Sequence, residues 1–171
     1  MQDIHIRWEG PLTFDSLKAL SGTTDRGLYQ IYGYHALYGS DVLLYIGKSA
    51  DSFARRVTRE RWDLSQDIAR FQVYLGRMEG PSGIPDEDLI AHIDIAERML
   101  IKAHLPAYNV QRSFDISEFK GFHVFNWGTF RSLFPEVSGA RWSDHFWTTG
   151  DRRELGTAIE ESDQQDIAQN C

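Results

Sequence analysis

Hydrophobic and polar positions recur along the chain in patterns that predict eight elements. Alternating positions, or runs of β-branched and aromatic residues, indicate strands, and apolar positions three or four apart indicate helices. The turn at 35–40 joins two of the strands into an antiparallel hairpin. The predicted strands are 4–8, 27–34, 41–47, 71–75 and 122–127, and the predicted helices are 14–20, about 51–62 and 86–105.

The helix at 86–105 has the clearest ends. Asp86, Glu87 and Asp88 stand in its first turn, where the positive end of the helix dipole favours anions. Pro106 stops it, because proline cannot continue a helix. The order of elements, β-α-β-β-α-β-α-β, predicts a mixed α+β domain.

Composition places these elements in one domain. The chain has 171 residues, of which 42% are hydrophobic, enough for one core. The final 22 residues carry six acidic and two basic side chains, so they hold more than half of the net charge of −7 and predict a disordered tail. We expect a domain at 1–149, comprising a core at about 26–112 and extensions at 1–25 and 113–149, followed by the tail at 150–171.

The chain lacks the marks of secretion or membrane insertion. Cys171 is the one cysteine, which excludes an intrachain disulfide and fits a reducing compartment. Residues 1–10 contain four charged or histidine side chains rather than an apolar leader, and no run reaches the roughly 18 apolar residues of a membrane span. The sequence predicts a soluble, cytoplasmic protein without membrane association.

Basic residues gather between 48 and 61 despite the acidic total. A local basic surface can hold a phosphate backbone, because fields are screened beyond about 8–10 Å. Charge alone favours a solvated helix face instead. The basic residues are Lys48, Arg55, Arg56, Arg59 and Arg61, against Asp51 and Glu60.

Glu97 lies on the apolar stripe of the helix at 86–105. A carboxylate there is costly unless it is paired with a cation or bound to a metal. Pairing with an arginine is the alternative to metal binding, and Asp94, four residues before Arg98, predicts such an ordinary surface pair. The stripe residues, at −7, −4 and +4 from Glu97, are Ile90, Ile93 and Ile101.

Five features occur in a fixed order, each on the expected type of element. They are the runs 27–29 (GLY) and 45–47 (YIG), followed by Arg56, Glu97 and Asn109. Over about 26–112 the chain therefore resembles the GIY-YIG nuclease family, and 96–110 (AERMLIKAHLPAYNV) is similar to the second half of that core in excision-repair nucleases. The resemblance implies an α+β fold, a small central antiparallel sheet flanked by helices, with extra C-terminal strand or loops. It implies a metal-dependent endonuclease that hydrolyses DNA phosphodiester bonds by attack of water.

The resemblance also implies a role for each site residue. Tyr29 would be the general base and Tyr45 would orient water or phosphate, although both are also ordinary packed strand tyrosines. Arg56 would stabilise charge on the phosphate. Glu97 would bind the single Mg²⁺ or Mn²⁺, which keeps several waters and takes phosphate oxygens. Asn109 would hold the site together by hydrogen bonds.

Four further residues would contact the substrate. Lys48 has two equally weighted interpretations, a charge beside the tyrosines or a surface lysine. The arginine at the family's usual distance from the YIG glycine is Arg55, but Arg56 directly precedes an apolar residue and is preferred as the catalytic one. Glu60 stands where some family members carry a histidine, which leaves the role of that position open. The expected substrate contacts are Gly47, Lys48, Arg55 and Arg59.

Other chemistries are excluded by what the motifs lack. The run 47–49 (GKS) ends like a phosphate-binding loop, but Val42 stands where that motif needs glycine, so no nucleotide cofactor is expected. The six histidines include no pair four apart, which argues against a zinc hydrolase. The expected partners are a DNA substrate and a second copy or another protein. The rival function is a nucleic-acid or protein-binding module that has lost catalysis on the same scaffold.

Overall fold

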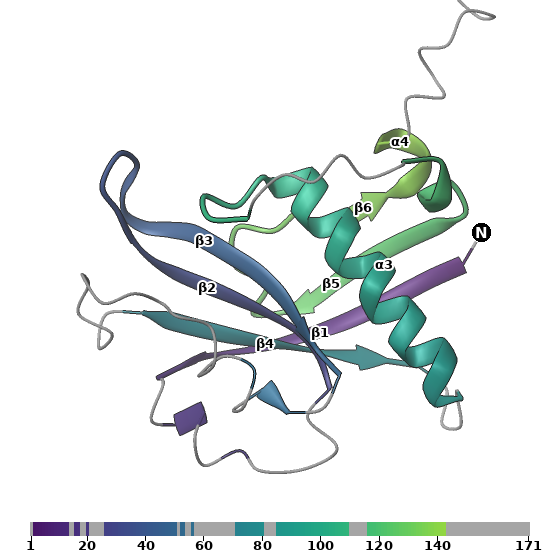
Figure 1. The fold of residues 1–171 in the computed structure, drawn as a ribbon, viewed down its shortest axis with the longest axis horizontal. Coiled ribbons are helices and arrows are strands. Elements are labelled where there is room, and N and C mark those ends of the chain that lie inside the picture. The colour runs from purple at the N-terminus through teal and green to yellow at the C-terminus, as the bar shows by residue number, and fades with distance from the viewer. Residues whose placement is uncertain are drawn as a thin grey trace, which may run out of the picture.

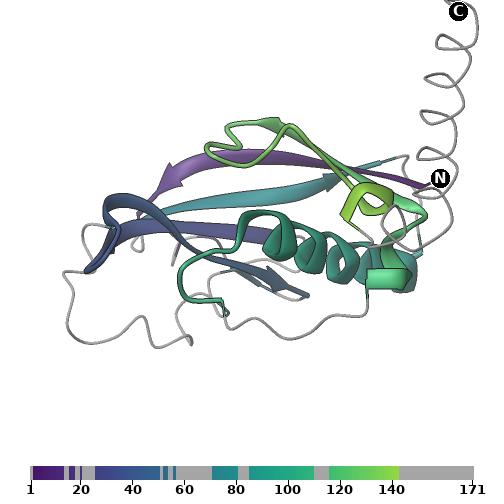
Figure 2. The same ribbon diagram turned by 90° about the horizontal axis from the view of Figure 1, so that it is seen from above.

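The structure is a computed structural model built around one curved β-sheet and one long helix (Figures 1 and 2). The fold is described for the residues 2–13, 16, 17, 20, 26–50, 52, 53, 56, 71–80, 85–109 and 116–142.

Six strands make up the sheet within the described residues. Their spatial order is β3-β2-β4-β1-β5-β6, and each neighbouring pair is antiparallel except β1 and β5, which run parallel. The strands are β1 (Gln2–Leu12), β2 (Gly27–His35), β3 (Gly39–Ser49), β4 (Gln72–Glu79), β5 (Phe122–Gly128) and β6 (Glu136–Ser138). The described helices are α3 (Asp86–His104), α4 (Gly139–Trp142) and the 3₁₀ turn η2 (Ile116–Phe119).

The expected α+β architecture, a small antiparallel sheet flanked by helices, is wrong. The part of the chain described here is mostly β, with 48% strand against 27% helix, and its sheet is a mixed half-barrel. The cause is β1, which was expected over 4–8 but extends over Gln2–Leu12 and pairs with β4 on one side and β5 on the other. This pairing adds three strands to the β2–β3–β4 group, and α3 alone provides a long described helix on one face (Figure 2).

The local predictions around the hairpin and the long helix are confirmed. The hairpin, the strand after it and the helix with an acidic first turn appear as β2, β3, β4 and α3. Of the helices predicted at 14–20 and about 51–62, the structure describes residues 16, 17, 20, 52, 53 and 56. Residues 16, 17, 53 and 56 are helical, whereas 20 and 52 are not. The tail at 150–171 lies outside the described residues.

Two apolar clusters form on opposite faces of the sheet. The larger one fills the space between α3 and the sheet, where Ile6, Trp8 and Leu28 meet Ala96 and Leu100. The second covers the other face of β2, β3 and β4 and contains Tyr29, with Ile31, Leu44, Phe53, Phe71, Val73 and Leu75 around it.

Gly27 is required by a close approach between strands. Its φ is +146°, and a Cβ there would lie 2.1 Å from the carbonyl oxygen of Gly76 on β4. No side chain fits at that distance, so the first glycine of the GLY run has a structural reason independent of any chemistry.

None of the helices in the described part of the chain is long and apolar enough to span a membrane.

Candidate active site

An ammonium and two carboxylates meet where the end of β3 faces the middle of α3. Lys48 Nζ lies 2.9 Å from Glu97 Oε2 and also forms an ion pair with Asp94. Asp94 and Glu97 stand three residues apart, so both project from the same side of α3. The Glu97 side chain is 15% exposed, whereas those of Lys48 and Asp94 are 38% and 42% exposed. Glu97 is therefore the least accessible group of the three.

Burial and charge act in opposite directions on Glu97. Burial raises the pKa of its carboxyl above the ordinary 4.5, and the negative charge of Asp94 adds to this. The hydrogen bond and charge of Lys48, with a smaller contribution from Arg56, lower the pKa but do not cancel the effect of burial. For Lys48, burial would lower the pKa of the ammonium, but its bonds to Asp94 and Glu97 prevail and raise it. The site thus keeps Lys48 charged beside a carboxyl that is costly to ionise.

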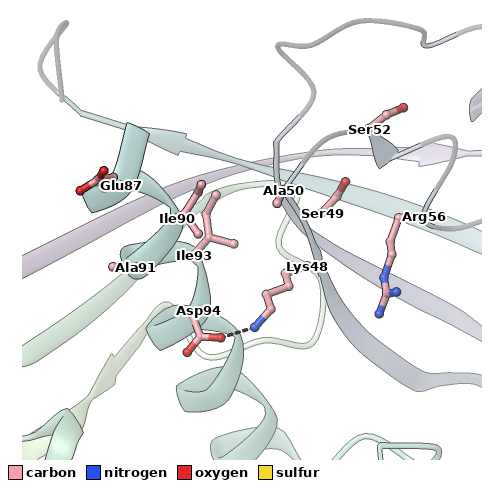
Figure 3. Close-up of a pocket in the computed structure, with 10 residues that line it drawn as sticks. All are labelled: Lys48, Ser49, Ala50, Ser52, Arg56, Glu87, Ile90, Ala91, Ile93 and Asp94. Carbon is pink, nitrogen blue, oxygen red and sulfur yellow. Dashed lines mark hydrogen bonds and ion pairs between the residues drawn. The ribbon is translucent and has the colours of Figure 1, made fainter. Parts of the chain in front are cut away.

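Arg56 approaches this group from the segment after β3. Its backbone N–H donates to Ser52 O at 3.0 Å, which is part of a helical turn. Arg56 and Lys48 line one pocket of about 660 Å³, with Asp94 on the α3 side (Figure 3). The remaining lining residues are Ser49, Ala50, Ser52, Glu87, Ile90, Ala91 and Ile93.

The two motif tyrosines lie on the other face of the hairpin. Tyr29 pairs with Gly47 across β2 and β3, and both tyrosines belong to the apolar cluster on the face away from α3. Their ring centroids are 6.0 Å apart, with 29° between the planes. A Cβ at Gly47 would lie 2.5 Å from the Tyr29 ring and 2.7 Å from the Tyr45 ring, so glycine is what lets the rings close over the strand. Tyr29 is fully buried.

Asn109 fastens the segment after α3 to the free edge of β3. Its side chain accepts a hydrogen bond from Ile46 N and donates one to Ile46 O, each at 2.9 Å. The N–H of Tyr108 donates to Leu44 O at 2.8 Å, one step further along the edge. These bonds cover an edge strand that would otherwise expose its backbone. Because this segment directly follows α3, the bonds also fix the position of β3, and with it that of Lys48, relative to α3.

The structure brings some of the predicted site residues together and separates others. Glu97, Lys48 and Arg56 share one side of the β3 end, whereas Tyr29 and Tyr45 lie across the sheet from α3. The predicted substrate contacts Arg55 and Arg59 fall outside the described residues.

Asp94 is the site residue that sequence reasoning missed. The surface pair that its spacing from Arg98 predicted is present at 3.8 Å, but Asp94 also forms an ion pair with Lys48, which that spacing did not predict. The spacing of three residues between Asp94 and Glu97 was the available signal, because such residues share a helix face.

The site offers few oxygen ligands for a hard divalent cation. Within the described ranges no group of three or more His, Cys, Asp and Glu side chains could enclose a metal ion. Mg²⁺ does not require such a cage, since it binds through one or two carboxylates and completes its shell with waters and phosphate oxygens. The partly buried Glu97 carboxylate fits that requirement as a single protein ligand.

Comparisons with known proteins identify no relative. No family model, curated protein or solved structure matches this chain.

Proposed function

We propose that the chain is a metal-dependent endonuclease that hydrolyses phosphodiester bonds of DNA. The observation that carries the proposal is the carboxylate of Glu97, which is only 15% exposed, is held 2.9 Å from the Lys48 ammonium and is influenced by the charge of Arg56. Burial raises the pKa of Glu97 although two cations favour its charged form, and groups with such perturbed pKa values gather at functional sites. The order of the GLY, YIG, arginine, glutamate and asparagine positions supports the same assignment.

Each charged group has a definite task in this proposal. Glu97 would hold Mg²⁺ or Mn²⁺, which would supply electrophilic stabilisation of the phosphate when bound. Lys48 and Arg56 both line the pocket, and Lys48 reaches from it to Glu97, so a phosphate in the pocket would meet positive charge close to the metal ligand. Arg56 would stabilise the charge that develops on the phosphate oxygens as water attacks.

The tyrosines have a more demanding task. Tyr29 as general base would need a path to the attacked phosphate, yet its ring is packed with Tyr45 on the face away from α3. The Tyr29→Phe variant distinguishes a chemical role from a packing role. Loss of cleavage with an unchanged free energy of unfolding would support Tyr29 as the general base.

The proposal is tested by incubating the purified chain with supercoiled, linear, branched and single-stranded DNA and Mg²⁺ or Mn²⁺. We expect cleavage that chelation abolishes, leaving 5′-phosphate and 3′-hydroxyl ends on sequencing of the termini. DNA binding without cleavage of any substrate would instead identify the rival, a binding module on this scaffold.

A pair of neighbouring variants tests the arginine. Arg56→Ala should lower turnover by a factor of ~10² or more, as expected for the loss of one charge-stabilising donor. Arg55→Ala is the comparison variant, because it removes the same charge one residue away at an expected substrate contact, where a smaller effect on turnover is expected than at Arg56. If Arg55→Ala is the damaging change, the catalytic arginine is Arg55.

A further inference from the structure

We propose that Asp94 is a positioning residue, which holds the Lys48 ammonium when Glu97 binds a divalent cation. The inference rests on the proposed function, because it takes Glu97 as the ligand of the metal.

The geometry provides one cation with two carboxylate partners. Lys48 reaches from β3 to α3 and contacts both Asp94 and Glu97, which lie one helical turn apart (Figure 3 shows the Asp94 contact). The two carboxylates differ in burial, since Glu97 is 15% exposed and Asp94 is 42% exposed. The ammonium therefore bridges an inner and an outer acid.

The contacts of Asp94 show that Lys48 is its principal partner. Arg98, its other basic neighbour, forms a longer ion pair with it at 3.8 Å. That guanidinium is bound to Glu118 at 2.6 Å and lies over the Phe119 ring, 4.8 Å from its centroid. Arg98 is thus shared between Asp94 and Glu118 and lies closer to Glu118, and the shorter contact of Asp94 is with the lysine.

Electrostatics explains why two acids are useful here. A divalent cation at Glu97 competes with the Lys48 ammonium for the same oxygens. With Glu97 alone, this exchange would leave a partly buried ammonium without a counter-ion beside a dication, and like charges at such distances repel strongly. Asp94 supplies the second partner, so Lys48 can yield Glu97 and remain paired. Its charge then stays at the pocket wall, where a phosphate would meet it.

The test is a double-mutant cycle on the binding of Mn²⁺ in the absence of DNA, measured by calorimetry or by the electron paramagnetic resonance of the free ion. Asp94→Asn should weaken Mn²⁺ binding about tenfold in the chain that keeps Lys48, since the lysine then has only Glu97. In the Lys48→Met background the same substitution should change the affinity less than about twofold. Lys48→Met alone should strengthen binding, because it removes the competitor.

Two controls make the cycle specific. Glu87→Gln removes one negative charge from the same pocket. An equal loss of Mn²⁺ affinity in that variant would show that any negative charge in the pocket has the same effect, and it would overturn the proposal. Asp94→Glu keeps the charge and should restore most of the affinity. Thermal unfolding of each variant checks that the fold is intact. We expect it to be, because the Asp94 side chain is 42% exposed.

The outcomes separate this inference from the proposed function. If Asp94→Asn weakens Mn²⁺ binding equally with and without Lys48, Asp94 is a direct ligand or acts independently, and the positioning role is wrong while the metal site stands. If the unmodified chain binds no Mn²⁺, or binds it equally well as Glu97→Gln, the metal site itself is wrong, and the role of Asp94 is overturned with it.

Discussion

Replacing Asn109 by alanine should destabilise the protein by releasing the edge strand β3. The side chain makes two hydrogen bonds to the backbone of Ile46, each at 2.9 Å. Each intramolecular bond contributes about 1 kcal/mol net, so the free energy of unfolding should fall by about 2 kcal/mol. For a domain of this size that corresponds to a decrease in Tm of roughly 4–8 °C. Chemical denaturation followed by tryptophan fluorescence measures the change.

An aspartate at the same position tests the direction of the two bonds. Its carboxylate can accept from Ile46 N–H, but it faces the Ile46 carbonyl oxygen that Asn109 Nδ2 now serves. Asn109→Asp should therefore cost at least as much as alanine at pH 7. It should recover part of the loss as the pH falls toward about 4, where a carboxyl takes a proton and can donate. Equal stability of both variants and the parent would refute this account of how β3 is held.

Three further predictions follow from other contacts. Gly27→Ala should cost more than about 3 kcal/mol or prevent folding, since its Cβ would lie 2.1 Å from Gly76 O at a φ of +146°; expression and circular dichroism measure this. Gly47→Ala should force the two tyrosine rings apart and lower the Tm, and an unchanged Tm would contradict the packing described. His104 accepts a hydrogen bond from Phe134 N, and burial lowers its pKa. As the pH falls, His104 is therefore protonated in the unfolded chain before it is protonated in the folded one. Stability relative to His104→Asn should be complete above pH 6.5 and decline as the pH falls below it, whereas parallel pH profiles would refute the assignment.

Local sequence signals predicted the elements around the site because each is encoded in a short window. The hairpin of β2 and β3 follows from two β-rich runs and a turn, and α3 follows from its apolar positions and Pro106. Even there the stripe was incomplete, since Ile90 is 45% exposed and lines the pocket rather than the core. Periodicity gives the face of a helix but not how far the neighbouring sheet extends over it.

The wider sheet could not be predicted, because its key pairing is distant in sequence. β1 lies parallel to β5, with Ile4 opposite Val124, and no local signal links segments so far apart. The β6 strand, Glu136–Ser138, is too short for a detectable alternation. Contacts among charged side chains were equally hidden: Lys48 had two interpretations, and only the packing of β3 on α3 shows that it meets Asp94 and Glu97.

The most direct test of the central claim is the initial rate at which supercoiled plasmid is nicked in saturating Mg²⁺ by the natural chain and by Glu97→Gln. The glutamine keeps the shape of the side chain, and Lys48 retains Asp94 as its partner, so both proteins should unfold at similar temperatures. The account predicts nicking by the natural chain and a rate for Glu97→Gln no higher than that measured with chelator. Nicking by Glu97→Gln at the natural rate, or no nicking by either protein, would contradict it.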